Sequence, residues 1–109
     1  MHARAMLGPE VNCYNVANVT LAEFAIVSQR AHLCTASHNI DDEQFNLTIA
    51  PIIMEKNSWV AAESFVGPGV TIGEGAVLAA RAVTVRNLEA WTVYAGNPAK
   101  SKRKRITQS

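Results

Sequence analysis

A six-residue period in the apolar residues constrains the fold of this chain more than any other feature. Starting at Met54, the hexads read MEKNSW, VAAESF, VGPGVT, IGEGAV, LAARAV and TVRNLE, and five of the six begin with an aliphatic residue. The fifth place is almost always small, and a second set, LAEFAI, VSQRAH and LCTASH, runs from Leu21 to His38. An α-helix repeats about every 3.6 residues and a strand about every two, so neither explains this period. The sequence therefore indicates a repeat architecture.

The period is explained if each hexad forms a short strand followed by a tight turn of about 120°. Three hexads then close one triangular coil of about 18 residues, and successive coils stack about 4.8 Å apart in parallel ladders. First-place aliphatic side chains point inward, while Gly or Ala suits the second place at each corner. We therefore predict an all-β parallel β-helix of about four coils, in a single domain spanning residues 1–109. So short a stack leaves lateral faces to cover, which favours assembly through those faces.

The hexads are interrupted by residues 39–50, which contain three consecutive acidic residues and no Gly or Pro. An insertion at a corner of a β-helix has to leave the body as a protruding loop, and such loops often carry function. His38 stands directly before this loop, where its imidazole is placed to act as a general base. A structural role is the alternative for a single histidine.

Half of the basic residues lie in the last ten positions: Lys100, Lys102, Arg103, Lys104 and Arg105. Residues 1–99 carry five basic and nine acidic side chains, so a basic tail over about residues 100–109 follows a mildly acidic body. This asymmetry predicts a phosphate-bearing or other anionic partner at the C-terminal end, with a solvated terminus as the alternative. A nucleic-acid partner is not expected, because neither an aromatic platform nor a second basic run accompanies this segment.

The remaining composition bears on location and on the cysteines. No apolar run approaches the roughly 18 residues that a membrane span needs, and residues 1–7 lack the apolar region of a signal peptide. We therefore expect a cytoplasmic protein with no membrane span. Cys13 and Cys34 are far apart and form no CxxC pair, so we interpret both as small core residues rather than as a disulfide or a zinc site.

Three stretches give the sequence a specific resemblance to a known family. LCTASHN at residues 33–39, the repeat block from Pro51 to Val85, and WTVYAGNPAK at residues 91–100 resemble the hexapeptide-repeat O-acetyltransferases. The closest group is the exopolysaccharide, colanic acid acetyltransferase type, with the maltose, galactoside and nodulation acetyltransferases as wider relatives. The resemblance covers about residues 7–105 and implies a left-handed β-helix, a handedness that the period alone does not provide.

The resemblance also implies an activity and an assembly. The family transfers an acetyl group from acetyl-coenzyme A to a saccharide or similar hydroxyl acceptor, in a homotrimer whose active sites lie between subunits. His38 matches the catalytic histidine, which takes the acceptor's proton as the hydroxyl oxygen attacks the thioester carbonyl. A backbone N–H, expected from the neighbouring chain, would hold the oxyanion. An amine acceptor stays open, because the same base would serve it.

Coenzyme contacts carry over from the family position by position. Trp59 matches the tryptophan beside the pantetheine arm, while Ala62 and Ala80 match small positions whose backbone groups pair with its amides. The closing turn and the two basic phosphate contacts are matched by Gly96, Asn97, Pro98, Ala99, Lys100 and Arg103. These basic charges are expected at flexible positions, which suit a phosphate-rich ligand. Asn15, in an early register two residues out of phase, is a candidate for contacting the acceptor.

No metal is expected at the active site. His32 lies one hexad before His38, which places the two on successive faces of the prism, so one subunit cannot chelate a metal with both. The zinc carbonic anhydrases built on this fold combine three histidines from adjacent subunits. Here the only other histidine, His2, precedes the repeat.

The sequence departs from the family pattern in several places. Ala36 and Lys56–Asn57 stand where the family commonly has Gly, and Glu89–Ala90 stand where it has a Pro-Pro pair. Relatives usually carry a longer N-terminal portion, whereas Met1 begins almost inside the repeat. The alternative function is therefore a truncated, catalytically reduced β-helix that serves as an assembly module.

Overall fold

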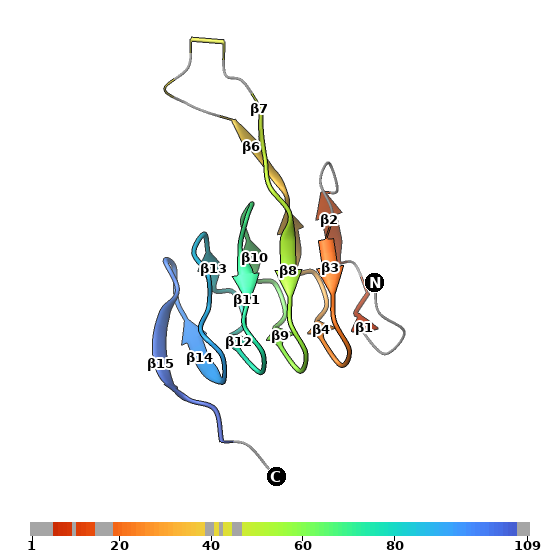
Figure 1. Cartoon of the computed structure of the whole chain (residues 1–109), viewed down its shortest axis with the longest axis vertical. Helices are drawn as coiled ribbons and strands as arrows, with labels where there is room; N and C mark the ends of the chain where they lie inside the picture. Colours follow the sequence, from red (N-terminus) through yellow and green to blue (C-terminus); the bar gives the residue numbers. More distant parts are fainter. Residues whose placement is uncertain are drawn as a thin grey trace.

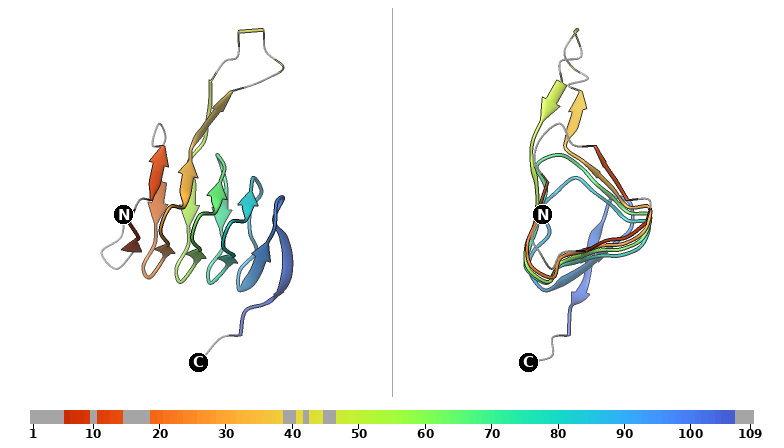
Figure 2. Two further views of the ribbon diagram at one scale, coloured as in Figure 1. Left: turned by 180° about the vertical axis from the view of Figure 1, so that it is seen from behind. Right: turned by 90° about the vertical axis from the view of Figure 1, so that its right-hand side faces the viewer.

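The computed structural model describes residues 6–9, 11–14, 19–38, 41, 43–44 and 47–106, of which 12–14, 37–38 and 47–48 are described by their backbone alone. The chain winds into a prism of stacked coils, seen from the side in Figure 1 and along its axis in the right-hand view of Figure 2, where its outline is triangular. Every regular element in the described ranges is a strand, which confirms the predicted all-β class. No helix in this part of the chain could cross a bilayer.

Three parallel sheets form the sides of the prism, and we call them faces 1, 2 and 3. Face 1 contains, in spatial order, β1 (Met6–Leu7), β4 (Ile26–Val27), β9 (Trp59–Val60), β12 (Val77–Leu78) and β14 (Thr92–Ala95). Face 2 contains β2 (Asn12–Tyr14), β5 (His32–Cys34), β10 (Phe65–Val66) and β13 (Val83–Thr84). Face 3 contains β3 (Val19–Leu21), β8 (Ile52–Met54) and β11 (Thr71–Ile72), with Leu88 bridged to Ile72. The chain visits the faces in this order, coil after coil.

The register of the ladders follows the hexads. In the regular block Phe65 pairs with Val83, which stands three hexads later in the sequence, as one full coil requires. Across the interruption the spacing nearly doubles, because Ile26 pairs with Trp59. The pairing of Met6 with Ile26 exceeds three hexads by two positions, which is the offset predicted for the early coil.

The core is built from the first and fifth places of the hexads. All of the described first-place side chains in the two sets of hexads are buried: Leu21, Val27, Leu33, Met54, Val60, Val66, Ile72, Leu78 and Thr84. So are the fifth-place ones: Ala25, Ala31, Ser58, Ser64, Val70, Ala76, Ala82 and Leu88. The two buried serines lose no hydrogen bond, because Ser58 Oγ donates to Glu55 O at 2.7 Å and Ser64 Oγ to Ala61 O at 2.6 Å. The predicted inward set is therefore confirmed.

The turns share one backbone feature. The fourth place of most hexads has positive φ, as in Asn57 (61°), Glu63 (59°), Gly75 (68°) and Arg81 (61°). Gly and Asn adopt this left-handed conformation readily, whereas Glu and Arg do so at a cost. At the second place the predicted shortage of room is also present, since a Cβ on Gly73 would lie 2.8 Å from Leu88 O.

The interruption leaves the body as a two-stranded antiparallel ribbon, which rises above the prism in Figure 1. Its strands are β6 (Ala36–His38) and β7 (Leu47–Ile49), so pairing begins before the predicted loop at residue 39. At the base of the ribbon, Ala50 N donates to Thr35 O at 2.9 Å. The ribbon is therefore joined to the prism through the coil that it interrupts.

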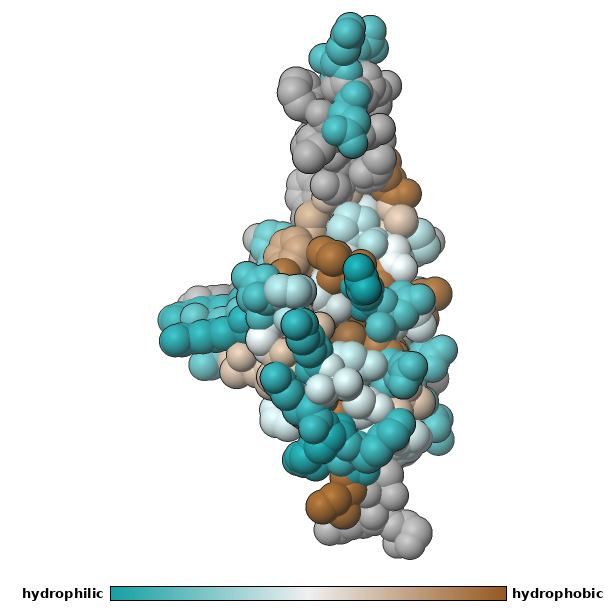
Figure 3. All heavy atoms as spheres, turned by 90° about the vertical axis from the view of Figure 1, so that its left-hand side faces the viewer, coloured by the Kyte–Doolittle hydropathy of each residue, from teal (hydrophilic) through white to brown (hydrophobic). Residues whose placement is uncertain are grey.

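The prediction of flexible positions for the C-terminal charges was wrong for residues 100–104. They form β15 (Lys100–Lys104), which pairs antiparallel with β14 and closes face 1. An edge strand presents its outer side to water, so charged residues are accepted there. Figure 3 shows the end of the prism that this strand covers, where hydrophilic side chains predominate.

Candidate functional site

Three corners separate the faces, and each is a column of stacked turns. The first corner, between faces 1 and 2, holds the turns at 29–30, 62–63, 80–81 and 96–97. The second corner, between faces 2 and 3, holds the turn at 68–69 and the base of the β6–β7 ribbon. The third corner, between faces 3 and 1, holds the turns at 23–24, 56–57, 74–75 and 90–91. The predicted site residues are distributed among these columns.

The structure stacks Ala62, Ala80 and Gly96 at the first corner. Arg81 N donates to Ala62 O at 3.0 Å, and Val83 N donates to Gly96 O at 3.0 Å, which ties the three turns to their neighbours. Among the described residues, neither the N–H nor the C=O of the exposed Ala80 has a hydrogen-bond partner. Ala80 therefore presents a free N–H and a free C=O on the surface of this column.

Trp59 lies beside this column on face 1. It stands in an outward row with Ile26, Val77 and Val93, because these residues are paired across adjacent strands. Its indole is 41% exposed, and Nε1 donates to Ser28 Oγ at 2.8 Å. This hydrogen bond fixes one edge of the indole against the first corner and leaves part of the ring exposed.

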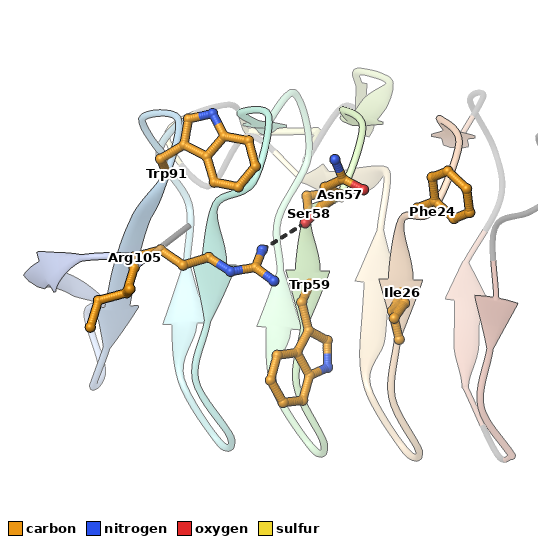
Figure 4. A pocket seen from close by; sticks show the side chains of 8 residues that line it. Phe24, Ile26, Asn57, Ser58, Trp59, Trp91 and Arg105 are labelled. Carbon is orange, nitrogen blue, oxygen red and sulfur yellow. Dashed lines mark hydrogen bonds between the residues drawn. The ribbon is translucent and has the colours of Figure 1, made fainter. Parts of the chain in front are cut away.

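Two hollows lie along face 1, and both are lined by Ile26. The larger, about 600 Å³, lies toward the third corner and is shown in Figure 4; its lining residues are Phe24, Ile26, Asn57, Ser58, Trp59, Trp91, Arg105 and Ile106. The smaller, about 410 Å³, lies toward the first corner and is lined by Ser28, Gln29, Ala62 and residues of β1 and β4. Ile26 borders both hollows, whereas Trp59 lines only the larger one.

The predicted phosphate contacts lie on β15, at the C-terminal end of the same face. Arg103 pairs with Val93, so its side chain extends the outward row that contains Trp59. Three strand spacings separate Trp59 from Arg103, which is about 14 Å. Lys100 pairs with Ala95, directly before Gly96, and therefore lies at the end of the first corner. Within the described part of the chain, neither cation is ion-paired with a carboxylate.

The closing turn connects these two regions. Gly96 has a φ of 98°, the Asn97–Pro98 peptide bond is cis, and Ala99 N donates to Val83 O at 2.8 Å. Gly96, Asn97 and Pro98 are exposed, whereas Ala99 packs against the core. The turn thus connects the first corner to the start of β15.

His38 is at a different corner. Its backbone lies in β6, paired with Leu47, on the ribbon that leaves from the second corner. Its side chain is outside the described residues, as is the whole of Asn15. Within one chain, the structure therefore separates the predicted base from the first-corner column that holds Ala62 and Ala80.

His32 and Cys34 take part in local contacts on or next to β5. The His32 ring lies 5.4 Å from the Phe65 ring, centroid to centroid, and Cys34 Sγ donates to Ala36 O at 2.9 Å. Among the described residues, no three His, Cys, Asp or Glu side chains gather as metal ligands.

The contacts of two residues around Trp59 are not predicted by the sequence. Ser28 holds its indole, and Arg105 crosses the larger hollow's edge to reach the third corner. The contact between Ser28 and Trp59 follows from strand pairing, because β4 lies directly beside β9 although the ribbon separates them in the sequence. No regular spacing in the sequence could have revealed Arg105, whose partners lie 48 and 30 residues away.

Comparisons with known proteins agree with this picture. The chain is 38% identical over 102 residues to WcaF of Escherichia coli (strain K12), a colanic acid biosynthesis acetyltransferase by name; the match covers 94% of this chain and 56% of WcaF. The chain thus spans little more than half the length of this relative. No protein-family model matches the chain.

Two groups of solved structures share the fold. A mutant of AntD, an N-acyltransferase from Bacillus cereus solved with dTDP-4-amino-4,6-dideoxyglucose and coenzyme A, superposes with a TM-score of 0.86 at 22% identity, covering 94% of this chain and 61% of AntD. A maltose O-acetyltransferase from Clostridium difficile 630 gives a TM-score of 0.80 at 22% identity, covering 96% of this chain and 61% of the other. At such identities these structures establish the architecture alone.

Proposed function

Because this chain belongs to the hexapeptide-repeat acetyltransferases, the group that includes its relative WcaF, we propose that it transfers the acetyl group of acetyl-coenzyme A to a hydroxyl group of a saccharide. One observation carries the proposal. The first-corner column with the free backbone groups of Ala80, the exposed Trp59 and the cations of β15 follow one another along the prism. The same membership supports a left-handed winding of about four coils in a single domain.

The coenzyme is proposed to run along the first corner. The amides of the pantetheine arm would pair with the backbone of Ala62 and Ala80, and its methylene groups would lie against the Trp59 indole. The separation of about 14 Å between Trp59 and Arg103 suits an extended arm. The phosphates would then meet Lys100 and Arg103, whose charge-assisted hydrogen bonds are stronger than neutral ones. The turn formed by Gly96, Asn97, Pro98 and Ala99 would border the ligand.

The chemistry requires a base and an oxyanion contact. An alcohol is a weak nucleophile at neutral pH, so His38 would accept its proton as the oxygen attacks the thioester carbonyl. The tetrahedral intermediate carries a negative oxygen, which a backbone N–H would stabilise. Collapse of the intermediate forms the ester and expels the coenzyme thiolate, which takes up a proton. Asn15 is retained as a candidate contact to the acceptor.

A second copy of the chain is needed to complete such a site. The ribbon with His38 and the column with Ala62 belong to different corners of one prism. The column is also convex, so one chain cannot enclose the pantetheine arm. We propose a homotrimer in which the ribbon of one copy approaches the first corner of the next. No metal ion takes part in this scheme.

Free-thiol release from acetyl-coenzyme A tests the proposal, with a panel of sugars, nucleotide sugars and oligosaccharides as acceptors. His38→Ala is compared with His32→Ala, a matched change one hexad earlier on the prism. Acceptor-dependent release should fall by about 10²-fold or more in His38→Ala, while His32→Ala should keep most of it and both should assemble like the parent. If the parent protein does not bind coenzyme A, the proposed acetyltransferase activity is contradicted and the alternative, an assembly module, is favoured.

A further inference from the structure

The C-terminal strand carries a dense run of cations, yet it is paired on one side only. Lys100, Lys102, Arg103, Lys104 and Arg105 follow one another on or directly after β15. Every residue of β15 is exposed, and among the described strands its ladder partner is β14 alone. That ladder is itself irregular, with a register shift between Val93 and Tyr94. Like charges repel one another along such a strand, so contacts at its ends add to the hold that the ladder with β14 supplies.

Both ends of the strand are fixed to the prism. At the start, Ala99 N donates to Val83 O at 2.8 Å. At the end, Arg105 N donates to Trp91 O at 2.7 Å, which continues the column of backbone hydrogen bonds at the third corner. The strand between these two points includes Lys100 and Arg103, the proposed phosphate contacts.

The Arg105 side chain adds a second, longer connection. Its Nη1 donates to Asn57 O at 2.9 Å and to Gly75 O at 3.1 Å, so one guanidinium joins β15 to two earlier turns of the third corner. The guanidinium carbon lies 5.7 Å from the centroid of the Trp91 ring, and Figure 4 shows the extended side chain reaching toward Asn57. Both hydrogen bonds come from one nitrogen, and the flat guanidinium also lies over the Trp91 ring; a lysine side chain is shorter and lacks that flat group.

We infer that Arg105 is a positioning residue for coenzyme binding: by clasping the third corner it fixes β15 and thereby the places of Lys100 and Arg103. The inference rests on the proposed function, because those two cations are assigned to the phosphates there. It goes beyond that function in giving a role to a residue that lies at the opposite corner from the proposed coenzyme path. Arg105 lines the same hollow as Trp59, but its side-chain hydrogen bonds to Asn57 and Gly75 are made at the third corner.

Loss of the Arg105 clasp should change the affinity for one part of the ligand only. Loss of the clasp should weaken the ligand through its phosphates and spare its pantetheine arm, which is held at Ala62, Ala80 and Trp59. The affinities of coenzyme A and of pantetheine, which has the arm without any phosphate, are therefore measured side by side by titration calorimetry. General destabilisation of the protein would lower both affinities together.

Arg105→Gln removes the clasp, Arg105→Lys keeps the charge without the flat guanidinium, and Lys102→Gln is the matched control. Lys102 is on the same exposed strand but belongs neither to the two anchors nor to the proposed ligand path. We expect the ratio of the coenzyme A affinity to the pantetheine affinity to fall about tenfold in Arg105→Gln and to fall clearly in Arg105→Lys as well. Lys102→Gln should change it by less than about threefold.

Hydrogen exchange of the β15 amides supplies the second readout. It should accelerate in both Arg105 variants relative to Lys102→Gln, with exchange in β9 and β12 unchanged. Faster exchange of β15 with an unchanged affinity ratio would overturn the inference, as would an equal loss of both ligands. If the parent shows no preference for coenzyme A over pantetheine, the proposed function fails, and the exchange experiment still decides whether the clasp exists.

Discussion

The indole of Trp91 occupies the space that a Cβ on Gly75 would need. Gly75 also has a φ of 68°, so both its backbone and its surroundings require glycine. We expect Gly75→Ala to lower the free energy of unfolding by about 2–3 kcal/mol. Gly69→Ala is the control, because Gly69 has a similar φ of 75° but faces only the Ala50 methyl group, at 3.2 Å. Denaturant titration of both variants measures the difference, and equal losses would contradict the packing role of Trp91.

Glu63 holds a backbone conformation that a side chain such as Asn adopts more readily. Its φ is 59°, and its carboxylate lies 3.7 Å from the Arg81 guanidinium in an exposed ion pair. Such a pair contributes little, so Glu63→Asn should raise the free energy of unfolding by about 0.5 kcal/mol through the turn alone. Glu63→Gln removes the same charge and leaves the strain, and it should show no gain in the same urea titration.

Ala82 is at a fifth place in the middle of the stack and is fully buried. Its neighbours are the inward side chains of the coils on either side, so additional methylene groups have no room. Ala82→Leu should therefore lower the free energy of unfolding by about 1–3 kcal/mol. Val85→Leu enlarges a side chain that is 63% exposed and should be nearly neutral. Thermal unfolding followed by circular dichroism compares them, and a silent Ala82→Leu would argue against a closely packed prism.

Ser28 restrains the Trp59 indole through its hydrogen bond of 2.8 Å. Ser28→Ala removes the acceptor and should free the ring, and the proposed coenzyme binding should weaken by about 1 kcal/mol, or about fivefold. The indole N–H signal of Trp59 in a nitrogen-edited NMR spectrum should move, while the signal of Trp91 stays in place. Ser101→Ala, on exposed β15, serves as the control. A shift without any change in affinity would show that the ring orientation does not matter for the ligand.

Periodicity explains what could be predicted from the sequence. The inward positions repeat with every hexad because each coil imposes the same geometry on the same place, so Leu78 and Ala82 could be assigned without coordinates. The corner column of Ala62 and Ala80 is a consequence of the same register. Two turns that stand three hexads apart in the sequence necessarily stack once the coil is recognised.

Contacts outside the repeat could not be predicted in this way. The segment KSKRK has the composition of a solvated tail, and nothing in it reveals that the free edge of β14 will pair with it. The bonds from Arg105 to Asn57 and Gly75 depend on where the chain returns after Trp91. Such contacts are set by tertiary placement, which has no sequence period.

The pairing of Ile26 with Trp59, across a stretch of chain nearly twice as long as a regular coil, has a consequence for how such a protein can change. The β6–β7 ribbon adds residues between two coils without disturbing the ladder on either side, because both of its strands return to the same corner. Its length and chemistry are thus free to vary while the prism stays the same. A lineage could alter the group it presents to a partner, or the acceptor it meets, by changing this one excursion alone.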